Sequence, residues 1–362
     1  MKAFVIVNAE FEETAATEIL ELTGAKAEVE GHALLFEAGQ EQIIRYSVHC
    51  LAPKRVVVLL EKCPDVLQIH FKDVNWNDYL TSSNSFKVEV EGVKGNPNRL
   101  EIAKTIAAAM FIQLRAQSLE PVIELKKPDL LCIVYFTGKN YYVGIDLLGK
   151  EINTREYRLF TNSNSFKGDY AYHILRTSKF AAGEKILLGM VKDGTLAVET
   201  ALFGYNLIVQ SKNKNQYSWN RIPLFSGVVA DSGKSDIPNP PSEKMIYAFD
   251  SNFQNVTAAK KNAIVAGVKE YLEISKYAID DVDVKFSPGY FDRIIFQITT
   301  KDEDQLNEIY YQSSYVLKQK GTLLLVTREK FEVSVPSTFT LIKEELITRG
   351  QSSHKLWLME KR

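Results

Sequence analysis

The chain has 362 residues, of which 45% are hydrophobic and 25% charged, and its formal net charge is −1. This length exceeds what one compact core usually holds, so we expect two or three domains. The near-zero charge excludes nucleic-acid binding by bulk attraction and leaves only a local basic patch for that role. Because Cys50, Cys63 and Cys132 form no CxxC pair, neither a zinc site nor a disulfide framework is expected.

The sequence also predicts the cellular location and the oligomeric state of the protein. The first residues, MKAFVIVNAEFEETAA, become acidic too early for a signal peptide. No apolar run reaches the roughly 18 residues that span a membrane. Scattered cysteines fit a reducing compartment. We therefore expect a cytoplasmic protein and, because no heptad or apolar stripe stands out, a monomer.

Residues 1–72 predict a small α+β domain. Short strands alternate with helices and no glycine-rich loop intervenes, which is typical of a ferredoxin-like layer. The expected strands are 3–7, 27–36 around a turn at Gly31, and 56–60, and the expected helices are 11–23 and 43–51. Since His32, His49 and His70 are isolated in sequence, we interpret them as structural.

Residues 73–158 predict a second α+β unit. The expected order is a strand at 85–90, a polar loop at 91–98, a helix at 100–114, and strands at 131–136 and 141–146 joined by a turn at 137–140. This succession resembles the THUMP domain of RNA-modifying enzymes. The resemblance is carried by SFKVEVEG at 85–92, Pro128–Asp129, YYVGIDLLGK at 141–150 and RxYR at 155–158. It implies a surface that docks the acceptor end of tRNA, and such domains often follow a ferredoxin-like domain.

Two groups of residues are candidates for RNA contact. Lys87, Lys94, Arg99 and Lys104 lie on a loop and helix start and would position phosphates without reading sequence. Interleaved glutamates leave open a merely solvated charged face. At the end of the unit, Arg155 and Arg158 could clamp phosphate and Tyr157 could stack on a base, or all three could form a packing hinge.

Residues 159–182 predict a linker with a helix at 170–177, and residues 183–362 predict a Rossmann-like sheet. Strands alternate with helices and the chain ends in a strand pair. The expected strands are 185–190, 206–210, 246–250, 291–298, 321–327, 338–341 and 353–359, and the expected helices are 195–205, one after Asp250, and 305–317. The polar stretch 212–241 is either an insertion loop or partly disordered.

Asp250 ends the apolar run IYAF and precedes a helix capped by Gly267. A carboxylate at the end of a buried strand is well placed to bind a ribose diol. An ordinary surface aspartate is the alternative.

The second half resembles the S-adenosylmethionine-dependent methyltransferases that carry THUMP domains and form N2-methylguanosine in tRNA. The matching stretches are YAFDSNFQNVTAAKKNAIVAGV, KDGTLAVETA and FDRIIF. The resemblance implies S-adenosylmethionine as cofactor, and it implies cofactor contacts at Asp193, Gly194, Thr195, Asp250 and Asp281.

Two stretches depart from that family. Its glycine motif begins with Asp-Pro and continues as Cys-Gly-Ser-Gly-Thr, whereas this chain has Leu188 at the acidic position and Lys192 at the first loop glycine. A lysine side chain there would block the cofactor's approach and repel its sulfonium. The catalytic Asn-Pro-Pro-Tyr is replaced by Gln297, Ile298, Thr299 and Thr300, so Gln297 is the single catalytic candidate and the stacking aromatic is gone.

These patterns favour a tRNA-binding protein whose methyltransferase-like domain has lost or weakened catalysis, acting alone or beside an active partner protein. One alternative is an active tRNA (guanine-N2) methyltransferase with divergent loops. The other is an α/β protein that binds a metabolite and does not act on RNA. No metal ligand set is expected.

Overall fold

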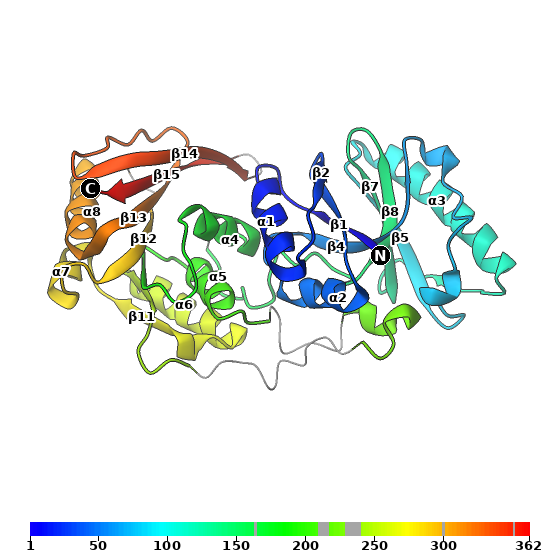
Figure 1. Cartoon of the computed structure of the whole chain (residues 1–362), viewed down its shortest axis with the longest axis horizontal. Coiled ribbons are helices and arrows are strands. Elements are labelled where there is room, and N and C mark those ends of the chain that lie inside the picture. Colours follow the sequence, from blue (N-terminus) through cyan, green and yellow to red (C-terminus); the bar gives the residue numbers. More distant parts are fainter. Residues whose placement is uncertain (163–164, 209–216, 229–239, 299–300, 350–351) are drawn as a thin grey trace. The chain divides into compact units, whose positions relative to one another are not determined.

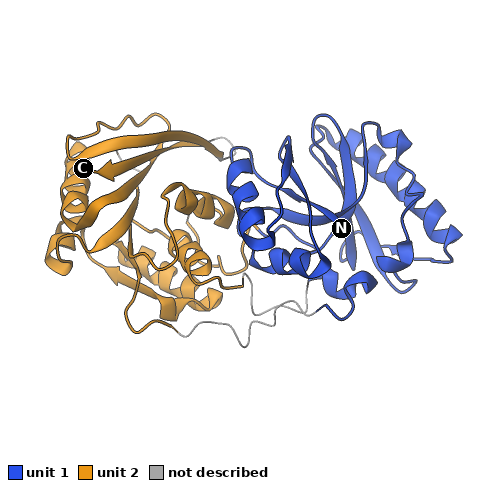
Figure 2. Ribbon diagram, viewed as in Figure 1, with its two compact units in different colours: residues 1–152, 212–232 blue, residues 153–211, 233–362 orange. Residues whose placement is uncertain are grey.

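A computed structural model describes residues 1–162, 165–208, 217–228, 240–298, 301–349 and 352–362. The chain forms two compact units (Figure 2). Unit 1 contains residues 1–152 and 212–232, and unit 2 contains residues 153–211 and 233–362. In the described part of the chain, no helix combines the length and apolar character that a membrane span requires.

Unit 1 is built on one eight-stranded sheet of order β2-β3-β1-β4-β8-β7-β5-β6 (Figure 1). Antiparallel pairing of β4 with β8, for example Val57 opposite Asp146, joins the two predicted α+β layers into this sheet. Its strands are β1 Lys2–Ile6, β2 Glu28–Glu30, β3 Ala33–Glu37, β4 Arg55–Cys63, β5 Ser85–Glu91, β6 Val122–Ile123, β7 Leu130–Phe136 and β8 Tyr141–Asp146. Its helices are α1 Glu12–Thr23, α2 Gln40–His49 and α3 Asn96–Ala116.

A buried arginine ties three strands of unit 1 together. Arg55 of β4 forms ion pairs with Glu89 at 2.9 Å and Glu91 at 2.5 Å, both on β5, and with Asp146 of β8 at 2.8 Å. Burial raises the pKa of Asp146, and the nearby guanidinium opposes that rise. A buried charge needs such partners, so the three carboxylates hold this part of the sheet in register.

Unit 2 is built on a seven-stranded sheet of order β11-β10-β9-β12-β13-β15-β14 (Figure 1). The first five strands in this order pair in parallel. β15 pairs antiparallel with both β13 and β14, which agrees with the predicted closing strand pair. The strands are β9 Ile186–Gly189, β10 Ile246–Asp250, β11 Leu272–Lys276, β12 Phe291–Gln297, β13 Leu317–Arg328, β14 Phe339–Arg349 and β15 Ser352–Lys361. The helices are α4 Gly168–Thr177, α5 Thr195–Gly204, α6 Phe253–Ala266, α7 Val282–Lys285 and α8 Glu303–Val316.

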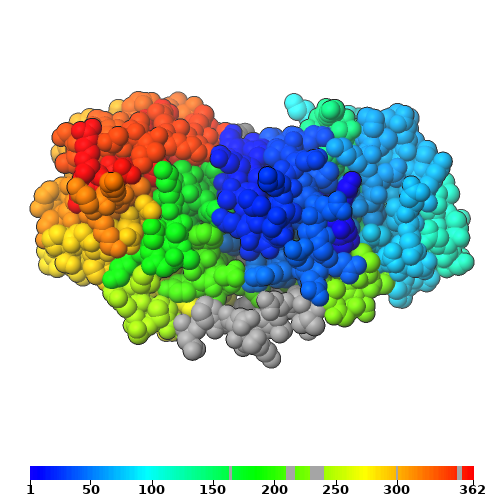
Figure 3. Space-filling view, viewed as in Figure 1, coloured from blue at the N-terminus to red at the C-terminus, as the bar shows by residue number. Residues whose placement is uncertain are grey.

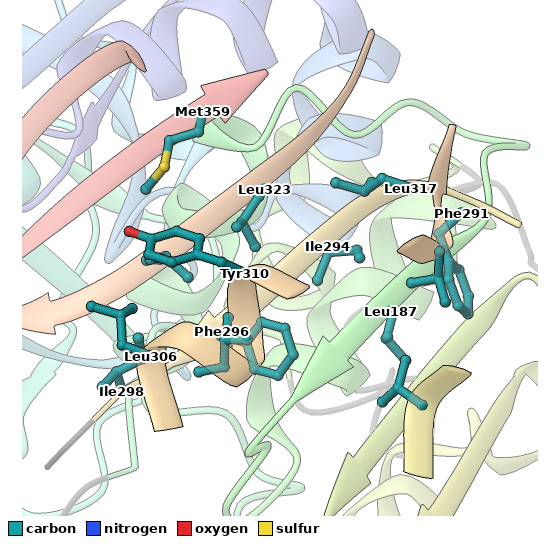
Figure 4. Close-up of a cluster of buried hydrophobic side chains, with 14 of the residues drawn as sticks. Leu187, Phe291, Ile294, Phe296, Ile298, Leu306, Tyr310, Leu317, Leu323 and Met359 are labelled. Atoms are coloured by element: carbon teal, nitrogen blue, oxygen red, sulfur yellow. The ribbon is translucent and has the colours of Figure 1, made fainter. Parts of the chain in front are cut away.

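One hydrophobic core cluster of unit 2 lies on one face of this sheet. Figure 4 shows side chains of β9, β12, β13 and β15 meeting residues of α8. Among them are Leu187, Ile294, Phe296, Ile298, Leu306, Tyr310, Leu323 and Met359, all buried. Removing this apolar area from water supplies the main driving force for folding of the unit.

Several predicted elements need correction. The loop predicted at 91–98 is too long, because α3 begins at Asn96 with Pro97 in its first turn, where a proline costs no hydrogen bond. Residues 206–208 form no strand, and the rest of that predicted strand lies outside the described residues. Within the predicted insertion 212–241, residues 217–228 are described. They form two short turns, and the Trp219 N–H donates to the Leu147 carbonyl at 2.8 Å within unit 1.

Candidate functional site

The candidate site lies at the carboxyl edge of the sheet in unit 2. Strand order reverses between β9 and β12, and open α/β sheets bind ligands at such a switch point. The loop after β9 has an unusual backbone: Met190, Lys192 and Gly194 have φ values of +57°, +55° and +77°. Only glycine adopts this region at no cost, so two of the three positions hold a left-handed conformation against their side chains. Three left-handed residues therefore shape this loop, although only one of the two glycines of the family motif is present.

Gly194 allows helices α5 and α6 to approach closely. A Cβ added at this position would lie 2.6 Å from the Cβ of Ala259. Together with its positive φ, this contact explains why glycine occupies the position. Gly194 thus serves the packing of unit 2 as well as the shape of the loop.

Asp250 stands at the end of β10, as the sequence predicted, and its carboxylate is buried and already hydrogen-bonded. Oδ1 accepts from the Asn252 N–H at 2.9 Å, and Oδ2 accepts from the Lys192 N–H and from Asn255 Nδ2, both at 3.1 Å. A carboxylate has about four acceptor sites, so these three bonds leave about one for a ligand. Asp250 thereby joins the loop after β9 to the start of α6.

Asp193 and Thr195 are also buried within the unit. Thr195 donates its N–H and its hydroxyl to Asp193 Oδ1, at 3.1 and 2.9 Å. Arg158 covers the pair, because its Nε donates to Thr195 Oγ1 at 3.1 Å and its guanidinium lies 3.7 Å from Asp193 Oδ2. Asn262, fully buried on α6, donates to the Asp193 carbonyl at 2.9 Å. These contacts make both residues part of the loop's own framework.

Lys192 lies between charged groups at the same edge. Burial lowers the pKa of its ammonium group; the charge of Asp250 opposes this effect and the charge of Arg328 adds to it. Asp250 ends β10 and Arg328 ends β13, and these strands stand on opposite sides of the β9–β12 pair. Lys192 follows β9 and Arg328 ends β13, so two cationic residues belong to the carboxyl edge that contains the switch point.

Gln297 and Asp281, the other two predicted residues of this site, lie in different settings. Gln297 ends β12 beside Val326 and is 8% exposed, and the following Ile298 is 4% exposed and part of the apolar core. Thr299 and Thr300 lie outside the described residues. Asp281 is exposed in the turn Ile279–Asp281, where its Oδ2 accepts from the Ala278 N–H at 3.2 Å. Among the described residues, no contact joins Asp281 to Asp250.

The predicted RNA contacts at Arg155 and Tyr157 do not fit this structure, because both side chains are buried in unit 2. Arg155 forms a two-point ion pair with Glu199 of α5, with Nε and a terminal nitrogen donating to the two carboxylate oxygens at 2.8 and 2.9 Å. The Tyr157 hydroxyl donates to Glu199 Oε1 at 2.6 Å. Since the side chains of Arg155 and Glu199 are 0% exposed, the RxYR segment is a packing element. Arg158 remains at the edge of the site.

The other predicted cations are on unit 1. Lys94, Arg99 and Lys104 are exposed at the start of α3, as the patch requires. Lys87 instead lies within the acidic network of Arg55, and its ammonium donates to Glu89 Oε1 at 2.6 Å. Among the described residues, no group of three or more His, Cys, Asp or Glu side chains is placed to hold a metal ion.

Sequence reasoning missed three features of this region: Glu199, Asn262 and a surface pocket beside α6. The pocket is lined by Phe160, Phe253, Gln254, Thr257, Ala258 and Lys261. A signal for it was present, since Phe253, Thr257 and Lys261 recur every four residues and so share one helix face. Asn262 and Glu199 gave no such signal, because their partners are distant in sequence.

Comparison with known proteins accounts for both units. Residues 65–146 match the THUMP domain, and residues 155–335 match the RMKL-like methyltransferase domain. The tRNA (guanine(6)-N2)-methyltransferase of Methanocaldococcus jannaschii is 22% identical over 95% of this chain and 96% of its own length. The ribosomal RNA large subunit methyltransferase K/L of Vibrio cholerae is 26% identical over 66% of this chain, which matches only 36% of that longer protein.

Solved structures share the complete fold. TrmN from Thermus thermophilus has a TM-score of 0.70 with 15% identity and covers 100% of this chain and 99% of its own. A possible methylase from Clostridium difficile 630 has a TM-score of 0.78 with 17% identity, covering 100% and 98% of the two chains. At these identities the likeness shows the fold alone.

The sheet order of unit 2 and the carboxyl-edge loop define a Rossmann-type methyltransferase fold joined to a THUMP domain. The chain belongs to the RMKL-like methyltransferase family. The resemblance predicted from the sequence, and the α/β plus α+β fold class that it implied, are confirmed.

Proposed function

We propose that this protein binds tRNA through its THUMP-containing unit and that methyl transfer by its methyltransferase unit is lost or strongly weakened. In this role it acts as a binding module, alone or beside an active enzyme. The observation that carries the proposal is the end of β12. Gln297 and Ile298 stand where the family resemblance places the base-holding Asn-Pro, and both side chains are buried. Buried side chains at these two positions are not presented to a flipped base.

The charges at the switch point also support weak use of S-adenosylmethionine. Asp250 would hold the nucleoside half of that cofactor, which supplies an electrophilic methyl group when bound. Its sulfonium is cationic, and the lysine at position 192 and Arg328 bring positive charge to the same edge. Because like charges in a partly buried site repel, the described residues fit the sulfonium half poorly.

An active tRNA (guanine-N2) methyltransferase is the second candidate. Two observations favour it: the carboxylate of Asp250 stands at the expected strand end, and Gly194 keeps its left-handed backbone. The first of the named relatives, over nearly its full length, is an enzyme of that description. In this case Asp250→Ala abolishes transfer.

Calorimetric titration of S-adenosylmethionine, with transfer of a labelled methyl group to tRNA transcripts, separates the candidates. The proposal expects tRNA binding, cofactor affinity weaker than about 100 μM, and no labelled RNA. Micromolar cofactor binding with transfer would establish the active enzyme. If the protein binds neither tRNA nor cofactor, both candidate functions are refuted and the metabolite-binding alternative remains.

Substitution at Lys192 tests the electrostatic argument directly. Lys192→Gly removes the charge and relieves the positive φ, whereas Lys192→Met removes the charge alone. We expect both variants to bind S-adenosylmethionine at least tenfold more tightly than the parent, and the glycine variant to bind most tightly. Unchanged affinity in both would show that this side chain does not oppose the cofactor.

The RNA contacts are tested on unit 1. Reversing Lys94, Arg99 and Lys104 to glutamate is expected to weaken tRNA binding and to reduce the slope of log affinity against log salt by about 0.7–0.9 per lost phosphate contact. Lys26→Glu, at an exposed position of the same unit outside α3, is the matched control. Equal effects of the patch and control variants would exclude this patch.

A further inference from the structure

A pocket of about 230 Å³ opens on the surface of unit 2 between the chain after Arg158 and the first turns of α6. Two phenylalanines line it, and both are exposed: Phe253 by 68% and Phe160 by 40%. Single exposed apolar residues are common, but two aromatic rings lining one pocket mark a binding surface. Residues near 250 reach the surface in yellow-green in Figure 3.

The Phe160 backbone is held rigidly. Its N–H donates to Asn262 Oδ1 at 3.1 Å, and Asn262 Nδ2 donates back to its carbonyl at 3.0 Å. Asn262 is fully buried and also holds the Asp193 carbonyl, so this anchor is shared with the loop after β9. A ring presented on a fixed backbone loses little entropy when a ligand binds.

Lys261 is the charged residue that lines the pocket. Helix α6 contains Lys260 and Lys261 and no acidic residue, and the pocket lies at its N-terminal half, where the helix dipole is also positive. The Lys261 ammonium lies 4.8 Å from the centre of the Phe160 ring. Flat apolar surface beside a cation complements a base joined to a phosphate.

We propose that this pocket holds one unpaired base of the bound RNA, stacked on Phe253 or Phe160, with a backbone phosphate at Lys261. Gln254 supplies a donor and an acceptor for the edge of the base, and the Thr257 hydroxyl, which donates to the Phe253 carbonyl at 2.8 Å, supplies an acceptor. The volume is below the 300–1,000 Å³ typical of drug-sized ligands, which suits a single base and excludes a duplex. The inference rests on the proposed RNA binding and names a second contact, on unit 2, for the same RNA.

The test uses the full chain and an eight-nucleotide single-stranded RNA that carries one 2-aminopurine, whose fluorescence falls on stacking. We expect quenching with the parent protein. Of Phe253→Ala and Phe160→Ala, the variant that loses the stacking ring should remove the quenching and weaken binding about tenfold at an unchanged salt slope, because stacking is not ionic. Lys261→Glu should weaken binding and lower the slope. Ile264→Ala, an exposed apolar residue of α6 outside the pocket, is the control.

Failure of this inference is distinguishable from failure of the proposed function. If tRNA and the oligonucleotide both bind, and the two phenylalanine variants match the Ile264 control while their circular dichroism is unchanged, the pocket does not hold a base. Loss of a protein partner by those variants with RNA binding intact would also overturn the inference. If the parent binds no RNA at all, the proposed function fails first.

Discussion

The buried cluster around Glu199 allows a sharp prediction for Glu199→Ala. The wild-type carboxylate accepts two hydrogen bonds from Arg155 and one from Tyr157, and the side chains of Arg155 and Glu199 are fully buried. The substitution removes the carboxylate that pairs with the buried guanidinium, leaving Asp169 as the remaining opposite charge that acts on it, and leaves the Tyr157 hydroxyl without this acceptor. Breaking a buried ion pair in this way costs about 3–5 kcal/mol. For a unit of nearly 200 residues this lowers Tm by roughly 6–20 °C.

The effect is measured by urea unfolding followed by tryptophan fluorescence. Trp357 is buried in unit 2, whereas Trp76 and Trp219 belong to unit 1, so a Trp76→Phe, Trp219→Phe background reports unit 2 alone. We expect a lower midpoint at unchanged slope. Glu199→Gln, which keeps an acceptor, should lose less, and Arg155→Met with Glu199→Leu should recover part of the stability because the unpaired guanidinium is removed, although Asp169 then loses the charge of Arg155. A loss below about 1 kcal/mol for Glu199→Ala would refute the reasoning, since that is the size of an exposed pair.

Three further predictions concern unit 2 and use the same reporter. First, burial acts to raise the pKa of Glu345, but His173 at 3.2 Å and Lys343 at 3.0 Å lower it to about 2. Because this folded pKa lies below the ordinary value of 4.5, Glu345 contributes up to about 3 kcal/mol of stability above pH 4.5 that is lost as pH falls toward 2. Glu345→Gln should flatten the pH profile in that range, and an unaltered profile would contradict the assignment. Second, Gly194→Ala should cost about 2–4 kcal/mol because its Cβ meets Ala259 at 2.6 Å, whereas Gly267→Ala, also at φ +77° but with no atom within 4 Å, should cost only about 1–2 kcal/mol. Equal losses would show that strain and not packing limits Gly194. Third, Asn262→Ala should destabilise unit 2 by about 1–3 kcal/mol, because the N–H of Phe160 and the carbonyl of Asp193 lose their buried partner. A stability equal to that of the parent would show that water replaces the amide.

The sequence anticipated much of the candidate site. The run IYAFD predicted both a buried strand and the placement of Asp250 at its end, because strand length and flanking helix signals are local properties. The departure at Lys192 was visible by comparing motifs. Its consequence was not, because the pKa of the Lys192 ammonium depends on burial and on the charges of Asp250 and Arg328, which lie far along the chain.

The RxYR segment shows what the sequence alone could not predict. An arginine or tyrosine at a unit boundary is equally compatible with an RNA clamp and with a packing contact. Glu199 decided between them, and it lies 44 residues from Arg155. No local pattern links two such positions, since a buried ion pair is selected by the packing of two elements.

The sequence by itself determined most of the strands and helices and the family to which the chain belongs, because hydrophobic period and motif spacing are written along the chain. It did not predict β11, Leu272–Lys276. The tertiary structure alone decided which predicted residues are reachable. It buried Asp193, Thr195, Arg155 and Tyr157 and left Phe160 and Phe253 exposed beside Lys261. The physical reason is that exposure depends on partners brought together by folding, and the free energy of those contacts is absent from any single segment.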